Sequence, residues 1–317
     1  LLALLNAQYY IDCCPDWNLI VLVPEQLKWM VPDGVAEIWS IPWSFSNGWI
    51  WNDWLADTIH QRLSSFENCA LSVAIPHPHS REWDIERFTG FKPLVPSHES
   101  ILPHGPVVTF IWRDDRFWAP NAPQNRGLRV LQRISRQLNL VKNPARIQRD
   151  RFIEVAKALR QDYPEINLAV AGLGERHSGL PVWIRDERTL QVSESIERSW
   201  CERYARSHLV IGMHGSNMLL PSAHAGAVLE LVATDRWGNF YQDILLHETD
   251  SRTLAHRCRF LPDETSPKTV AEVARTMLTL PKWLKLCEAR RRVTAAGSFH
   301  RPHQSGLKEQ QCAALPE

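Results

Sequence analysis

The chain has 317 residues, of which 44% are hydrophobic and 22% charged, and its formal net charge at pH 7 is +1. This length suffices for two domains, and the composition is that of a globular protein, which excludes a fibrous or wholly disordered chain. So small a net charge creates no field that draws the chain to nucleic acid or to a membrane surface. No apolar run reaches the ~20 residues that span a bilayer. The apolar start, LLALLNAQYY, lacks a basic region and a small-residue cleavage site, so we do not expect a signal peptide.

The cysteines are odd in number, scattered, and contain no C-x-x-C pair. This pattern argues against a zinc site and against a disulfide framework, and it favours a reducing, cytoplasmic compartment. The seven are Cys13, Cys14, Cys69, Cys201, Cys258, Cys287 and Cys312.

The first third of the chain alternates strands and helices, which predicts an α/β fold with a parallel sheet. The predicted elements are helices at 1–12, 25–31 and 49–63, and strands at 18–24, 35–42 and 70–76. Asp53 and Asp57 lie on or near the polar side of the third helix. The side chains of that helix expected to face inward are Trp51, Trp54, Leu55 and Ile59.

The stretch from 76 to 106 is rich in proline and histidine, which favours loops and a linker between two domains. Histidine clusters can bind metals, but the HPH run at 77–79 has an extended backbone that places its two rings on opposite sides. We therefore predict no metal site in this linker.

The second part again alternates strands and helices. Strands are predicted at 106–112, 166–174, 180–186, 208–213 and 228–232, and helices at 152–164, 196–207, 267–280 and 282–293. The polar stretch 119–150 is expected to form an active-site loop with part of a helix, the stretch 234–246 a loop entering a helix, and the residues after 296 no fixed structure.

The stretch from 208 to 232 predicts a strand, a turn, a short helix and a second strand. Gly212 and Gly215 bracket the turn, and Ser216 or Asn217 can cap the helix by accepting from its free N–H groups. A helix start behind a buried strand suits a phosphate group, and His214 adds a donor beside it. The alternative is a turn that binds nothing, with a structural histidine.

Arginines end the first strand of this second part. Arg113 and Arg116 follow the strand where α/β proteins place ligand contacts, and arginine suits bidentate phosphate binding. Asp114 and Asp115 would neutralise or orient them. The alternative is a surface cluster of ion pairs. The pair Gly172-x-Gly174, after the next strand, is a weaker signal for the same edge.

Four segments, in this order, resemble the C-terminal donor domain of GT-B-fold glycosyltransferases, and above all glycosyltransferase family 61. They read VVTFIWRDDR, FIEVAKALRQDYP, INLAVAG and WCERYARSHLVIGMHGSNMLLPSAHAGAVLELV. The family's strand, HGA turn, proline-containing helix and VVEL-type strand have counterparts at His214–Ser216, Pro221 and Leu229–Leu231, and its arginine matches Arg113. The resemblance covers about residues 106–246, and Ser216-Asn217 replaces the family's small apolar residues.

The resemblance implies two Rossmann-like domains that face each other across a cleft, the GT-B arrangement. Residues 1–105 would form the acceptor-side domain with its linker, 106–265 the nucleotide-sugar-binding domain, and 266–317 C-terminal helices and a tail. The chain would move a sugar from a nucleotide-sugar to a glycan or other hydroxyl acceptor, with inversion and without a metal. The nucleotide-sugar is a co-substrate, so no bound cofactor is expected.

The resemblance also assigns roles to residues. The donor diphosphate would meet the turn at Gly215–Asn217, and Glu230 would bind ribose hydroxyls or cap nearby N–H groups. A general base must take the acceptor's proton. Asp53 and Asp57 are candidates, or simply a solvated helix face. The donor-binding candidates are Arg113, Arg116, Gly172, Gly174, His214, Gly215, Ser216, Asn217 and Glu230, with His214 also a catalytic candidate.

Two other functions stay open. A polysaccharide pyruvyl transferase-like enzyme also uses a basic cleft and a histidine, but takes phosphoenolpyruvate and needs no nucleoside diphosphate. A non-catalytic α/β interaction module would keep the fold without converging polar groups. We expect no nucleic-acid partner and no integral membrane segment. The tryptophans concentrate in the first part of the chain, where they could form an oligomer interface.

Overall fold

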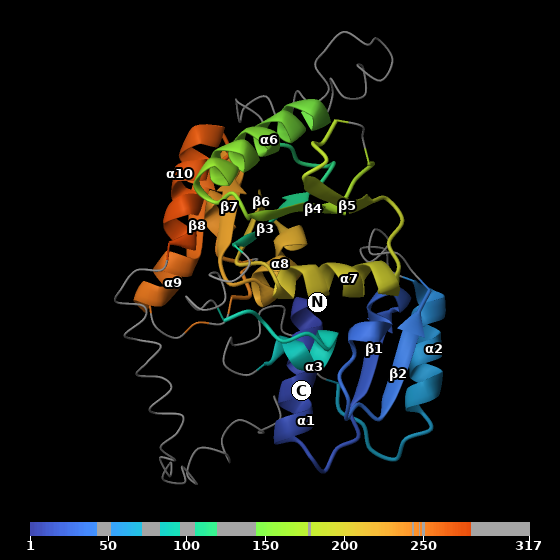
Figure 1. Cartoon of the computed structure of the whole chain (residues 1–317). Coiled ribbons are helices and arrows are strands. Elements are labelled where there is room, and N and C mark those ends of the chain that lie inside the picture. Colours follow the sequence, from blue (N-terminus) through green and yellow to red (C-terminus); the bar gives the residue numbers. More distant parts are fainter. Residues whose placement is uncertain are drawn as a thin grey trace, which may run out of the picture. The chain divides into compact units, whose positions relative to one another are not determined.

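The computed structural model describes most of the first 279 residues, which belong to one compact unit, Leu1–Thr279 (Figure 1). The predicted histidine pair at 77–79, most of the strand at 70–76, most of the polar stretch 119–150 and the helix at 282–293 lie outside the described residues. The described ranges are 1–42, 52–71, 83–95, 105–118, 144–176, 179–242, 244–246, 248 and 251–279.

The N-terminal elements follow the predicted order. Strands β1 and β2 pair in parallel, as the alternation of strands and helices predicts. The short helix between them is a 3-10 helix, η1. The elements are α1 (Leu2–Cys13), β1 (Ile20–Pro24), η1 (Glu25–Met30), β2 (Glu37–Ile41), α2 (Asp53–Leu63) and α3 (Ile85–Thr89).

Helix α2 forms where predicted, and of its predicted inward side chains Leu55 and Ile59 are half-buried, whereas the prediction for Trp54 is wrong. Trp54 is 61% exposed, and no residue of α2 is buried. The helix instead contacts β2 through Arg62, whose guanidinium lies 5.0 Å from the centre of the Trp39 ring. Trp51 lies outside the described residues. Asn52 begins the helix, because its side chain accepts a hydrogen bond from the amide of Leu55.

Part of the predicted linker is ordered structure. Asp84 caps α3 by accepting from the amide of Glu86, and Gly90 ends the helix in the left-handed conformation. Ile85 and Phe88 of α3 are buried in an apolar cluster with Leu5 of α1 and Met30 of η1. The predicted boundary near residue 105 stays a prediction.

Six parallel strands form the main sheet, in the order β5-β4-β3-β6-β7-β8. This is the 3-2-1-4-5-6 order of Rossmann-type sheets, because the first strand of the sheet, β3, lies in the middle beside the fourth. The edge strand β8 is absent from the sequence prediction. The strands are β3 (Val107–Trp112), β4 (Asn167–Leu173), β5 (Ile184–Thr189), β6 (Leu209–Met213), β7 (Val228–Val232) and β8 (Cys258–Pro262).

Helices cover both faces of this sheet (Figure 1). Helices α6 and α10 pack together over one face, and α7 and α8 lie over the other. Two 3-10 helices, η3 and η4, follow β6 and β7. The bounds are α6 (Pro144–Asp162), α7 (Glu194–Ala205), η3 (Ser216–Met218), α8 (Leu219–His224), η4 (Thr234–Asn239), α9 (Ser251–Arg257) and α10 (Pro267–Leu278).

Apolar spacing explains why these helices form where they do. Phe152, Val155, Ala156 and Leu159 of α6 recur at helical spacing, and all four are fully buried against the sheet. Ser266 caps α10 and a proline occupies its first turn, as the sequence indicates. Both strands that flank the short α8, β6 and β7, are buried along their whole length.

Candidate functional site

The candidate site lies at the switch point of the main sheet, where the order in which the strands are added reverses. Strands β3 and β6 are neighbours, with Ile111 opposite Gly212, although the chain makes β4 and β5 between them. Loops leaving the carboxyl ends of two such strands turn to opposite sides, which opens a crevice where α/β proteins bind ligands. Arg113 follows β3 and His214 follows β6, so the two predicted motifs meet at this switch point.

Arg113 is held from several sides. Its Nη1 donates to the Asn217 side-chain oxygen at 2.7 Å and to the His214 carbonyl at 3.2 Å. Its Nε and Nη2 donate to the two carboxylate oxygens of Asp115, at 2.6 and 2.5 Å. The side chain of Arg113 is only 12% exposed, whereas that of Asp115 is 66% exposed. The predicted pairing of arginine with a neighbouring aspartate is therefore present, and it is bidentate.

A second arginine reaches the same carbonyl. Nη1 of Arg116 donates to the His214 carbonyl at 2.5 Å. The loop that carries both arginines is fixed from α6, because the buried Gln148 donates to the carbonyl of Arg113 and accepts from the amide of Trp118. Sequence reasoning missed Gln148, since a glutamine in an amphipathic helix gives no sign of facing inward.

Several positive charges lie near one another at the carboxyl ends of the strands. The pKa of Arg116 is lowered, first by burial and then by the charges of Arg113 and Arg236, while Asp115 and Asp235 act in the opposite direction. Arg236 lies in η4, directly after β7. Three guanidinium groups and two carboxylates therefore share the edge, which is an arrangement suited to a phosphate-bearing ligand. The sequence prediction missed Arg236, although its place after a buried strand was a usable signal.

Asp115 stays ionised beside these cations. Burial alone would raise its pKa, but the net shift is downward because the hydrogen bond and the charge of Arg113 outweigh burial. Asp114 does not share this role: its side chain accepts a hydrogen bond from the Trp112 indole at 2.6 Å. Of the two predicted partners, only Asp115 binds an arginine in the structure.

His214 and Glu230 form a buried pair behind the arginines. The His214 ring nitrogen Nδ1 lies 2.6 Å from Glu230 Oε2, and the two side chains are 2% and 0% exposed. Glu230 occupies the middle of β7, opposite Gly212, rather than a strand end. Its carboxylate contacts His214, and a ribose-binding role for it stays a prediction. His214 meets the arginines through its carbonyl.

The turn after β6 depends on Gly215. Its φ of 143° is one that residues with a side chain rarely adopt, and an added Cβ would lie 2.5 Å from Nη1 of Arg113. The predicted cap is wrong: neither Ser216 nor Asn217 caps the helix through its side chain. The Asn217 side-chain oxygen is used by Arg113 instead, because a guanidinium is a stronger partner than a backbone amide.

Gly172 and Gly174 serve packing at the neighbouring strand end. A Cβ on Gly172 would lie 2.3 Å from the Trp112 carbonyl, and one on Gly174 would lie 2.4 Å from the Trp112 ring. The guanidinium of Arg188 lies over the same ring, 4.4 Å from its centre. The two glycines thus bring β3 and β4 close together, and the structure gives them no direct part in the arginine cluster.

The candidate bases lie elsewhere in the fold. Asp53 and Asp57 are exposed on α2, in the N-terminal part of the unit. Neither is among the charged groups that shift the pKa of Arg116 or Asp115. A role for either as general base stays a prediction.

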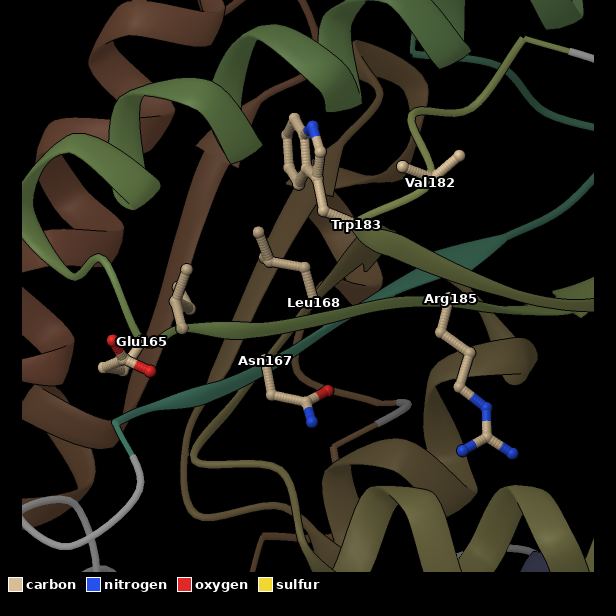
Figure 2. A pocket seen from close by; sticks show the side chains of 7 residues that line it. Glu165, Asn167, Leu168, Val182, Trp183 and Arg185 are labelled. Atoms are coloured by element: carbon tan, nitrogen blue, oxygen red, sulfur yellow. The ribbon is translucent and has the colours of Figure 1, made fainter.

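A cavity of about 420 Å³ opens at the other end of the sheet, where the amino ends of the strands lie. Figure 2 shows Glu165 and Arg185 at its two ends, with Asn167 between them, at the amino ends of β4 and β5. Arg185 is 69% exposed and pairs with Glu187. We do not place the active site here, because its charges are solvated and do not converge.

Comparisons of the chain with protein-family models, with curated proteins and with solved structures each found no match. The resemblance to glycosyltransferase family 61 stays a prediction. Within the described residues, no three His, Cys, Asp or Glu side chains are grouped as metal ligands, and no helix is long and apolar enough to cross a membrane. Fold and site together define a Rossmann-like parallel α/β protein with a basic turn at its switch point.

Proposed function

We propose that the chain is a glycosyltransferase that takes its sugar from a nucleotide-sugar. The observation that carries the proposal is the convergence of Arg113 and Arg116 on the carbonyl of His214, at the switch point of a 3-2-1-4-5-6 sheet. Rossmann-type sheets bind nucleotides at this position, and paired guanidinium groups suit a diphosphate. The likeness of the surrounding segments to family 61 donor domains supports the sugar-transfer reaction.

The arginines have a clear task in that reaction. The bond between the sugar's anomeric carbon and the diphosphate oxygen breaks, its electron pair stays on the diphosphate, and the acceptor oxygen bonds to the anomeric carbon. The acceptor's proton passes to a base. Negative charge therefore grows on the leaving diphosphate, where Arg113, Arg116 and Arg236 would stabilise it. Groups fixed before the reaction stabilise such charge most effectively, and Arg113 is fixed by Asn217.

The first test is release of nucleoside diphosphate from a panel of nucleotide-sugars, with water as the acceptor and glycans added in turn. We expect release with one donor or a few. Arg113→Ala should lower the affinity for that donor about 10- to 100-fold, because charge-assisted hydrogen bonds are lost. Arg185→Ala, at the amino edge, is the matched control and should behave as the wild type.

Three results would contradict the proposal. Binding of phosphoenolpyruvate with no response to any nucleotide would favour the pyruvyl transferase-like reading. Equal loss of affinity in Arg113→Ala and Arg185→Ala would show that the switch point is not the donor site. A chain that binds no member of the panel would favour the non-catalytic module.

A further inference from the structure

An aromatic cluster lies at η4, the 3-10 helix that carries Arg236. Trp237 and Phe240 have ring centres 5.8 Å apart, and Phe240 packs edge-on against Phe260 of β8 at 4.7 Å. Tyr241 adjoins the same group, 6.4 Å from Phe240. Trp237 keeps 37% of its surface exposed, so the ring is braced on one side and open to solvent on another.

The position of Trp237 links it to the anion site. It follows Arg236 directly in η4, the 3-10 helix that leaves the carboxyl end of β7. Strand β7 pairs in parallel with β6, so η4 leaves the same end of the sheet as the turn at Gly215, and the charge of Arg236 helps to lower the pKa of Arg116. Adjacent Cα atoms are about 3.8 Å apart, so the backbone of Trp237 lies beside that of Arg236. In a nucleotide a single ribose separates the base from the phosphates, so one ligand can reach both an arginine and an aromatic ring at the same end of the sheet.

We propose that Trp237 is the stacking surface for the nucleotide base, with the diphosphate on Arg113 and Arg116. This inference rests on the proposed function and names the second half of the same ligand. An indole gives a broad face to a purine or a pyrimidine, and stacking accepts any base because every base has a π-face. Phe240, which packs on Phe260, contacts the indole, and Arg236 precedes Trp237 in the same 3-10 helix.

A ligand that has phosphates but no nucleobase tests the arginines separately from Trp237. Inorganic pyrophosphate fits the arginines alone, whereas UDP, GDP, CDP and ADP reach both parts. Affinities are measured by titration calorimetry on the full chain, for the wild type and for Trp237→Ala, Trp237→Phe and Arg113→Ala. Trp17→Ala is the matched control, because Trp17 is 56% exposed in the turn after α1.

Trp237→Ala should weaken binding of the preferred nucleoside diphosphate about 5- to 100-fold and leave pyrophosphate binding unchanged. Unchanged pyrophosphate binding also shows that the variant is folded. Trp237→Phe should restore most of the affinity, because a smaller ring still stacks. Arg113→Ala should weaken pyrophosphate and nucleotides alike, and Trp17→Ala should alter neither.

The failures of the two proposals are distinguishable. If pyrophosphate and nucleotides bind equally well, and Trp237→Ala changes neither, the stacking surface is wrong and the anion site stands. If Trp237→Ala lowers only the affinity for a glycan acceptor, the ring binds the acceptor and the inference is overturned. If neither pyrophosphate nor any nucleotide binds the wild type, both proposals fall.

Discussion

Two buried histidines mark opposite edges of the main sheet and have opposite surroundings. His214 follows β6 at the carboxyl edge and meets the carboxylate of Glu230. His224 ends α8 near the amino edge, where its ring nitrogens lie 2.8 Å from the Thr89 hydroxyl and 2.8 Å from the Leu220 carbonyl. Burial lowers the pKa of His224 to about 4, so its ring is neutral at pH 7. His214 therefore faces a carboxylate, whereas His224 contacts a hydroxyl and a carbonyl.

The comparison teaches how to recognise the site in this fold. The amino edge has the 420 Å³ hollow, but its arginine is 69% exposed. The carboxyl edge has Arg113 at 12% exposure, with partners on three sides. Fixed, half-desolvated cations interact with an anion more strongly than solvated ones do, because water screens the latter. Arrangement of charge, rather than the volume of a hollow, favours the carboxyl edge.

The largest effect should come from removing the carboxylate behind His214. Glu230→Ala leaves a buried histidine without its partner, and breaking a buried pair in this way costs about 3–5 kcal/mol. Because His214 also holds both arginines through its carbonyl, pyrophosphate affinity should fall as well. Urea unfolding and calorimetric titration measure the two effects.

Glu165→Ala is the control for that variant, since Glu165 lines the exposed hollow at the other edge. It should change the free energy of unfolding by less than about 0.5 kcal/mol. Similar losses in both variants would contradict the view that the buried carboxylate of Glu230 stabilises the fold more than a solvated carboxylate does.

The next effect concerns His224 and pH. The native pKa of about 4 lies below the ordinary 6.5, so between these values the unfolded chain binds a proton that the native chain does not. Stability should therefore fall as the pH drops from 6.5 to 4, by a total on the order of 3 kcal/mol. In His224→Gln this part of the slope should vanish. Unfolding in urea at pH 4 to 7 measures it, and parallel slopes for the two proteins would refute the assignment.

Much of the fold follows from local patterns in the sequence. Strands β3, β6 and β7 are largely apolar, apart from Thr109 and Glu230, because parallel strands are buried on both faces, and α6 has apolar residues at helical spacing. Strand β8 was missed because CRFLP is short, carries an arginine, and is only partly buried at the sheet edge. No local pattern distinguishes it from a loop.

The site was predictable only in part. Arg113 and the turn at Gly215 follow strands, so their meeting at one edge could be expected. The partners of these residues could not be predicted. Asn217 accepts a hydrogen bond from Arg113 instead of capping the helix, and Glu230 contacts His214 from within a strand. These pairings join segments far apart in sequence, and they depend on strand order, which local periodicity does not encode.

The smallest effect should come from Asp115. Its carboxylate occupies Nε and Nη2 of Arg113, the donors that a phosphate would use. Asp115→Asn removes the competing charge, so pyrophosphate affinity should rise about 2- to 5-fold, the range of an exposed ion pair. Because the pKa of Asp115 is lowered below 3.8, the carboxylate is ionised throughout pH 5–8. The ratio of variant to wild-type affinity should therefore stay constant over that range.

Asp114→Asn is the matched control, because that carboxylate accepts from the Trp112 indole and not from an arginine. It should leave pyrophosphate affinity unchanged. A loss of affinity in Asp115→Asn would reverse the interpretation: Asp115 would then orient Arg113 toward the anion rather than compete with it. In that case the fixed geometry of the carboxyl edge, more than its net charge, would distinguish it from the solvated edge opposite.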